Sequence, residues 1–178
     1  MRDDQQRDEP FPLAVTLRDG RSVTVRPICP EDKDELEAAF VRLCAEARYT
    51  RFFTAVRALP ENVLDAATHP APGREVALVA LSDEGPRKII IGGARYVLAP
   101  GSDTCEFAVT VADDWHGLGL ARRLMEMLIE IARARGVRRM EGFVLPANSG
   151  MRGLAARLGF TDTPYPEDRT LRVVTLEM

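Results

Sequence analysis

The sequence predicts an α/β protein of the α+β type, in which helices flank a mixed central sheet. Three strand-like runs over 75–81, 88–98 and 103–111 are joined by turns, which predicts an antiparallel meander. The third run leads through a glycine-containing loop into a long amphipathic helix over 117–135. A strand-like run over 137–145 follows that helix. Such a strand–helix–strand unit is typical of a right-handed parallel crossover.

Four elements are expected before the meander. Asp19-Gly20 lies between two alternating runs, which is a strong hairpin signal. The first helix is expected to begin at Pro30, because proline followed by acidic residues suits a first turn. The aromatic residues between the two helices are expected to anchor their segment on the core. The hairpin, the first helix, the aromatic segment and the second helix are expected at 13–26, 30–47, 48–53 and 60–67.

The elements after the meander show helical and strand patterns in turn. The long helix presents one apolar stripe and ends at Gly136. Asn148 is expected to cap a last helix that ends at Gly159. Two strands complete the chain, one beginning at Phe160 and one over 170–178. The apolar stripe of the long helix consists of Leu120, Leu124, Met127, Leu128 and Ile131.

Composition bounds the class of protein. The chain has 178 residues, of which 46% are hydrophobic and 29% charged, so one globular domain over 13–178 is expected after a disordered tail over 1–12. A formal net charge of −3 argues against nucleic acid as a partner. No run is long and apolar enough to span a membrane, and the charged N-terminus lacks the apolar core of a signal peptide. A cytoplasmic protein is expected.

Cysteine and histidine usage predicts no metal site. The three cysteines are widely spaced and form no C-x-x-C pair, which is typical of free thiols in a reducing compartment. The two histidines, His69 and His116, stand at no ligand spacing from a cysteine. No metal is therefore expected in the function.

The loop over 114–123 predicts an anion site. A turn from strand into helix leaves backbone N–H groups without partners at the positive end of the helix dipole. Gly117 and Gly119 lack Cβ atoms, so an anion can approach the main chain closely there. We therefore expect a ligand that carries a pyrophosphate. A Rossmann dinucleotide site is disfavoured, because this loop lies late in the chain and after a meander.

The same loop carries a family resemblance. The segment 111–121 resembles the acyl-CoA pyrophosphate loop of the GNAT superfamily of N-acetyltransferases, with His116, Gly119 and Ala121 at the positions of its pattern. Within that superfamily the chain is most similar to bacterial Pat-type protein lysine acetyltransferase domains, and it would correspond to the catalytic domain alone. The matching segments are 17–20, 25–27, 48–53, 74–80, 106–109 and 113–115.

The resemblance implies a GNAT fold in which the pantetheine arm of acetyl-CoA lies between two splayed parallel strands. Acetyl-CoA would be the co-substrate, and Asn148 would bind it in addition to capping its helix, or would only cap the helix. The cofactor-binding residues implied are Val109, Thr110, Val111, His116, Gly117, Leu118, Gly119, Leu120, Ala121, Arg122 and Asn148.

The resemblance also implies that Glu106 is the general base. Acetyl transfer needs a neutral amine, and a lysine ammonium is mostly protonated at neutral pH. The alternative for Glu106 is a carboxylate on the wet face of a strand. Cys105 should point to the opposite side of the strand, which disfavours a cysteine acyl-enzyme.

Two positions depart from the family pattern. His116 stands where glutamine or arginine is usual. The last helix has Leu154, Ala155 and Ala156 where many relatives carry a tyrosine that acts as general acid. The resemblance therefore supplies no general acid for this chain.

The predicted function is acetyl transfer from acetyl-CoA to a primary amine, with a protein lysine as the expected acceptor. A small-molecule amine is the first alternative. The second is a module that senses acyl-CoA without turnover. The chain is expected to act as a monomer or a homodimer, without nucleic acid or membrane as partners.

Overall fold

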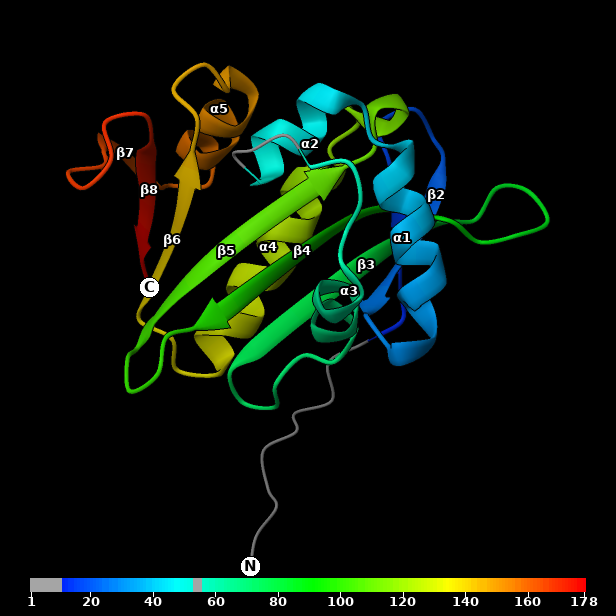
Figure 1. Ribbon diagram of the computed structural model, residues 1–178, viewed down its shortest axis with the longest axis horizontal. Helices are drawn as coiled ribbons and strands as arrows, with labels where there is room; N and C mark the ends of the chain where they lie inside the picture. The colour runs from blue at the N-terminus through cyan, green and yellow to red at the C-terminus, as the bar shows by residue number, and fades with distance from the viewer. Residues whose placement is uncertain (1–10, 53–55) are drawn as a thin grey trace, which may run out of the picture.

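A computed structural model describes residues 11–52 and 56–178 of the chain. Within this part of the chain, an eight-stranded mixed sheet runs in the order β1-β2-β3-β4-β5-β6-β8-β7 (Figure 1). The β5–β6 pair is parallel, and the other neighbours are antiparallel. The strands are β1 Leu13–Thr16, β2 Ser22–Pro27, β3 Glu75–Ser82, β4 Ile90–Leu98, β5 Thr104–Val111, β6 Arg139–Val144, β7 Thr161–Pro164 and β8 Arg172–Glu177.

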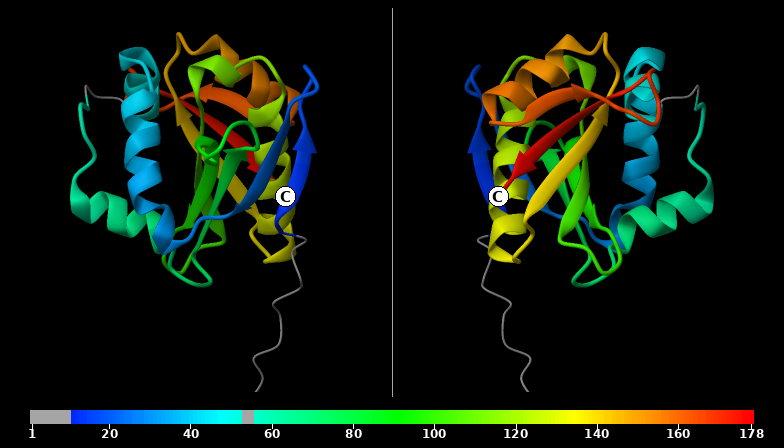
Figure 2. Two further views of the ribbon diagram at one scale, coloured as in Figure 1. Left: turned by 90° about the vertical axis from the view of Figure 1, so that its right-hand side faces the viewer. Right: turned by 90° about the vertical axis from the view of Figure 1, so that its left-hand side faces the viewer.

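Helices cover both faces of the sheet (Figure 2). The first three lie on one face, which we call the front face, and the amphipathic helix α4 lies on the other (Figures 1 and 2). The main core lies between α4, α5 and the back of the sheet. The helices are α1 Lys33–Arg42, α2 Ala45–Phe52, α3 Glu61–Thr68, α4 Leu120–Ala134 and α5 Ser149–Arg157.

The predicted hairpin, meander, crossover and fold class are confirmed, and the apolar stripe of α4 is buried as expected. The helix α4 begins at Leu120 rather than at Gly117. Gly117 and Gly119 have φ angles of 75° and 88°, which a right-handed helix does not allow. The two glycines therefore form the loop that precedes the helix.

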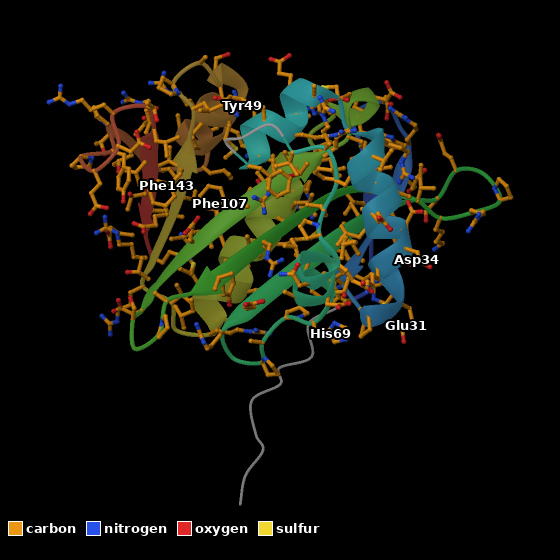
Figure 3. All side chains as sticks on the ribbon, in the orientation of Figure 1. Glu31, Asp34, Tyr49, His69, Phe107 and Phe143 are labelled. Atoms are coloured by element: carbon orange, nitrogen blue, oxygen red, sulfur yellow. The ribbon has the colours of Figure 1, made fainter. Side chains whose placement is uncertain are left out.

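The single helix expected over 30–47 is wrong. A short 3₁₀ turn precedes α1, and the chain turns at Leu43 (φ −66°, ψ 140°) before α2. The guanidinium of Arg48 donates hydrogen bonds to the carbonyls of Val41 and Leu43, which satisfies acceptors at the end of α1. The aromatic anchor is confirmed only in part. Phe52 packs on Phe40 at a centroid distance of 5.6 Å, whereas Tyr49 is 48% exposed. Figure 3 shows the position of Tyr49 on α2.

Several expectations concern residues outside the described part. Residues 1–10 of the expected tail and Phe53 of the aromatic segment lie outside the described residues. Phe11 is described, and it packs against the main core. Among the described residues, no helix is both long and apolar enough to cross a membrane.

The central feature of the sheet is the early end of the β5–β6 pairing. The two strands pair only at Thr104↔Arg139, Cys105↔Met140 and Glu106↔Glu141. Beyond that point β5 stays paired with β4 as far as Val111, and β6 stays paired with β8 as far as Val144. The two strands thus separate, and the facing edges lose their mutual hydrogen bonds.

Phe107 closes the back of this opening. Its ring lies against the backbone of Gly142 on β6 and meets the ring of Phe160 edge to face at 5.3 Å. Phe107 is buried, and a Cβ atom added at Gly142 would lie 2.5 Å from its Cε1. Only glycine at position 142 leaves room for the ring.

We therefore expect Gly142→Ala to lower the free energy of unfolding by about 1–3 kcal/mol, the usual cost of overpacking a core. Urea unfolding followed by circular dichroism measures it. Gly153→Ala is the matched control, because its new methyl would meet only the flexible end of Arg157 at 3.6 Å inside α5. That control should be neutral or slightly stabilising. Equal stabilities of Gly142→Ala and the unsubstituted chain would contradict the packing described.

Candidate active site

A cleft of about 640 Å³ lies where β5 and β6 separate. Its walls come from β5, the loop before α4, the start of α4, the end of β6 and the start of α5. The helix α2 lies across the end of β5 on the front side (Figure 1). Every residue expected at the site lines this cleft except Leu118.

The edge of β5 that faces the cleft can be assigned from its hydrogen bonds. Ala112 donates to the carbonyl of Ile91 on β4, so the even-numbered residues of β5 direct their backbone groups to β4. The odd-numbered residues, including Val109 and Val111, therefore face the cleft. Asp103 fits this alternation, because its carbonyl accepts hydrogen bonds from the N–H groups of Arg138 and Arg139, on the side of β6. The free N–H groups of Val109 and Val111 line the opening.

Thr110 consequently has a different role from its neighbours. Its carbonyl points toward β4, where it would lie 3.1 Å from a Cβ added at Gly92. The main chain of Thr110 is therefore engaged in the sheet, and only its side chain faces the cleft. Of the three β5 residues expected at the cofactor, only Val109 and Val111 therefore offer main-chain groups to the cleft.

The loop before α4 forms the other end of the cleft. Among the described residues, no acceptor is found for the backbone N–H groups of residues 117–122. Gly119 is the N-cap of α4 and provides no side-chain cap. Six successive free N–H groups at the positive end of a 15-residue helix form a site for phosphate.

Two loop residues also make polar contacts within the protein. The Nε2 of His116 lies 2.8 Å from the carbonyl oxygen of Val111, so the imidazole donates back to the strand end. The side chain of Leu118 packs on the core, and its carbonyl accepts a bond from the N–H of Arg18. These bonds engage the Nε2 of His116 and the carbonyl of Leu118 within the protein and shape the loop, while the N–H of Leu118 remains one of the free groups.

Arg18 is a cleft residue that the sequence does not reveal. It belongs to the β1–β2 hairpin, far away in sequence, and its Nε would lie 3.6 Å from a Cβ added at Gly119. The hairpin is held there by Arg21, whose guanidinium lies 3.8 Å above the ring of Trp115. A cation thus lies beside the free N–H groups.

Glu106 lies at the branch point of β5 and β6. Its side chain is exposed on the front face, in the cleft, while Cys105 beside it is only 1% exposed on the back. Burial raises the pKa of Cys105 to about 12, so the thiol stays protonated at neutral pH. The expected opposition of Cys105 and Glu106 is confirmed, and a cysteine acyl-enzyme is disfavoured.

Glu141 is a second carboxylate that sequence reasoning missed. It is directly opposite Glu106 in the last pair before the strands separate. The pKa of Glu106 is raised, first by desolvation in the cleft and then by the negative charge of Glu141, while Arg51 opposes the shift. The register of a parallel strand pair places these carboxylates together, and a single sequence does not specify that register.

The C-terminal part of the cleft includes Asn148 and Phe143. The Oδ1 of Asn148 accepts the N–H of Met151 at 3.1 Å, which confirms its capping role, and the residue also lines the cleft. Phe143 lies on β6 (Figure 3) and meets the ring of Tyr165 edge to face at 4.8 Å. The hydroxyl of Tyr165 donates to Glu167 at 2.6 Å, and this bond raises the pKa of Tyr165.

The described residues include no group of three or more histidine, cysteine, aspartate or glutamate side chains that could hold a metal ion. The cleft offers other means of binding: free backbone N–H groups for a phosphate and for an amide-rich arm, and carboxylates for an amine. These groups suit a nucleotide-linked thioester and an amine acceptor.

Comparison with known proteins agrees with this arrangement. The profile of the acetyltransferase (GNAT) family matches residues 37–160. An acetyltransferase of Pseudomonas aeruginosa is 36% identical over 155 residues, which are 87% of this chain and 83% of that protein. The acetyltransferase Pat of Mycolicibacterium smegmatis is 34% identical over 154 residues; the match covers 83% of this chain but only 44% of that protein.

Solved structures show the same fold. The GNAT domain of S. lividans PAT superposes with a TM-score of 0.84 at 28% identity, over 93% of this chain and 96% of that one. A Salmonella typhimurium structure with acetyl-CoA bound superposes with a TM-score of 0.68 at 21% identity, over 87% of this chain and 93% of that one. The chain therefore belongs to the GNAT family and is an acetyl-CoA-dependent N-acetyltransferase.

Proposed function

We propose that the chain transfers an acetyl group from acetyl-CoA directly to a primary amine, with Glu106 as the general base. The observation that carries this proposal is the position of Glu106, a carboxylate of raised pKa at the branch of the cleft. A raised pKa makes a carboxylate a stronger base at neutral pH. The buried, protonated thiol of Cys105 favours direct attack over a covalent intermediate.

The backbone groups suit the donor. The free N–H groups of residues 117–122 would hold the pyrophosphate, with Arg18 beside them. The N–H of Val111 would bond the pantetheine arm, and that of Val109 the thioester oxygen, where it would stabilise the negative charge of the tetrahedral intermediate. Asn148 would add a side-chain contact to the arm from the start of α5.

The reaction then needs one proton acceptor. Glu106 removes the proton from the amine, directly or through water, as the nitrogen attacks the carbonyl carbon. The C–N bond forms, the C–S bond breaks, and coenzyme A leaves as a thiolate that is protonated by water. Among the described residues of the cleft, no tyrosine is found to protonate the sulfur, which agrees with the absence of tyrosine from α5.

A protein lysine is the acceptor favoured by the relatives. The resemblance to Pat-type proteins spans most of the chain, both in sequence and in fold. Glu106 and Glu141 on the front face would attract a lysine ammonium to the branch point.

A small-molecule amine is the second candidate. It is favoured by an apolar cavity of about 400 Å³ under the first three helices. This volume is larger than the side chain of a protein lysine needs, and it is typical of small-molecule sites. Acceptors of this class are also named among the relatives: a P. aeruginosa protein 44% identical over 57 residues, covering 32% of this chain and 33% of that protein, is an L-methionine sulfoximine and sulfone acetyltransferase.

We expect Glu106→Gln to lower turnover by about two to four powers of ten, the usual contribution of a general base. Thiol release from acetyl-CoA, with lysine-rich proteins and small amines as acceptors, measures it. Acetyl-CoA affinity should change little, because the free N–H groups remain.

Glu130→Gln, on the exposed side of α4, is the matched control and should keep full activity. Unchanged turnover in Glu106→Gln would remove Glu106 from the base role. Binding of acetyl-CoA without thiol release for any acceptor would support an acyl-CoA sensor instead.

Glu141→Gln should shift the acidic limb of the pH profile of kcat/KM. The base must be ionised, so activity falls as the pH drops through the pKa of Glu106. Removing the negative charge of Glu141 lowers that pKa, and the limb of kcat/KM should shift to lower pH. A limb that stays at the same pH in the variant would show that Glu106 does not set it.

A further inference from the structure

The cavity under the helices adjoins the cofactor cleft and shares lining residues with it. It lies between the front face of the sheet and helices α1, α2 and α3, and its volume of about 400 Å³ is typical of small-molecule sites. Arg51, Ala108 and Thr110 line both the cavity and the cleft. Arg51 therefore lies between the apolar cavity and the cleft that Glu106 lines.

Small residues on the sheet make room for this cavity. In the register, Ala77, Arg95 and Ala108 are neighbours on three successive strands, and so are Val79, Gly93 and Thr110. Apart from Arg95, the floor residues of these two rows have short side chains. Apolar residues of the helices form the opposite wall, among them Leu36, Phe40, Leu43, Phe52 and Val63.

Arg51 is the exception in this apolar surround. It is partly buried on α2, and its contacts are a face-on approach to the ring of Phe52 at 4.9 Å and electrostatic interactions with Arg95 and Glu106. Among the described residues, no hydrogen-bond acceptor or ion-pair partner is found for its guanidinium. Arg95, by contrast, is paired with Glu75 at 3.0 Å.

An unpaired cation in a partly apolar site favours an anionic ligand. Keeping a buried charge without a partner is costly, and a carboxylate matches the planar guanidinium with two hydrogen bonds. Desolvation lowers the pKa of Arg51, followed by the repulsion of Arg95, while the negative charge of Glu106 opposes the shift. A ligand carboxylate at Arg51 would therefore be stabilised by two cations, Arg51 and Arg95. Arg51 thus supplies a site for a carboxylate close to Glu106.

We propose that the acceptor is a free α-amino acid with an apolar side chain, whose carboxylate binds Arg51 and whose side chain fills the cavity. The inference rests on the proposed amine transfer at Glu106 and specifies its small-molecule candidate. An α-amino acid carries its amine, carboxylate and side chain on one carbon. These three groups match Glu106, Arg51 and the apolar cavity, which meet at Ala108 and Thr110.

The chemistry is that of the proposed transfer. The amino nitrogen loses its proton to Glu106 and forms a bond with the acetyl carbon. The C–S bond breaks, and the products are an N-acetyl amino acid and coenzyme A. Each methylene of the side chain that enters the cavity should raise kcat/KM by about fourfold, from about 0.8 kcal/mol per buried CH₂.

The test is thiol release from acetyl-CoA with matched pairs of acceptors. Each apolar amino acid, such as leucine or phenylalanine, is compared with the amine that lacks its carboxylate, 3-methylbutylamine or 2-phenylethylamine. The unsubstituted chain should prefer the amino acid by about 30-fold or more, the lower range for a buried hydrogen-bonded charge pair. This comparison needs no variant, so it stands even if substitutions at Arg51 impair folding.

The variant Arg51→Gln should abolish most of that preference, and Arg51→Lys should retain part of it. Arg57→Gln is the matched control, since Arg57 is exposed and does not line the cavity. It should keep the full preference. The ratio between paired acceptors is the readout, because a general loss of stability would lower both rates alike.

The outcomes separate this inference from the proposed function. Thiol release with protein lysines or simple amines, but without preference for the carboxylate, would overturn the role of Arg51 and leave amine transfer intact. Absence of release with every acceptor would overturn the proposed function itself. Preference for succinyl-CoA over acetyl-CoA that disappears in Arg51→Gln would assign Arg51 to the acyl group, which also overturns the acceptor proposal.

Discussion

The site depends on the point at which β5 and β6 stop pairing. Each strand keeps its outer neighbour, β4 or β8, so neither strand can turn to restore the lost bonds. Free backbone groups are costly unless water or a ligand satisfies them. An extended, amide-rich arm can satisfy them as an added strand does. The ring of Phe107 against Gly142 fills the back of the gap, so that the opening faces the front.

The two ends of this opening carry opposite charge. At one end, six N–H groups, the dipole of α4 and the cation Arg18 favour negative charge. At the other end, Glu106 and Glu141 are adjacent at the branch and favour the cation of an incoming amine. The pyrophosphate of a nucleotide-linked thioester fits the first end, and an amine acceptor fits the second. Arg51 adds a positive charge near the acceptor end, where it distinguishes among amines.

Much of the fold could be predicted because its signals are local. Asp19-Gly20 specifies the hairpin, and the glycines at 117 and 119 place the phosphate loop between a strand and an amphipathic helix. The resemblance to GNAT proteins then identified Glu106 and the cleft-lining segments. The break at Leu43 was missed because the apolar spacing continues through it. The side chain of Arg48, from the next helix, satisfies the carbonyls at the C-terminal end of α1.

The missed residues of the site all depend on long-range placement. Arg18 reaches the loop only because the hairpin docks on Trp115, and Glu141 meets Glu106 only through strand register. Arg51 indicates an anion site only once the structure shows that, among the described residues, its guanidinium has no hydrogen-bond acceptor or ion-pair partner. The alternation of backbone groups along β5 also distinguishes three residues that have similar positions in the sequence. The main-chain groups of Val109 and Val111 face the cleft, and those of Thr110 face β4.

The most direct test is amide hydrogen exchange resolved by residue, with and without coenzyme A. The account predicts that the N–H groups of Val109 and Val111, and those of residues 117–122, exchange rapidly in the free chain and slowly when coenzyme A is bound. The N–H of Thr110, bonded in the sheet, should exchange slowly in both states. Protection that is absent at Val109 and Val111 while coenzyme A is bound would contradict the claim that the separated strand edge holds the cofactor.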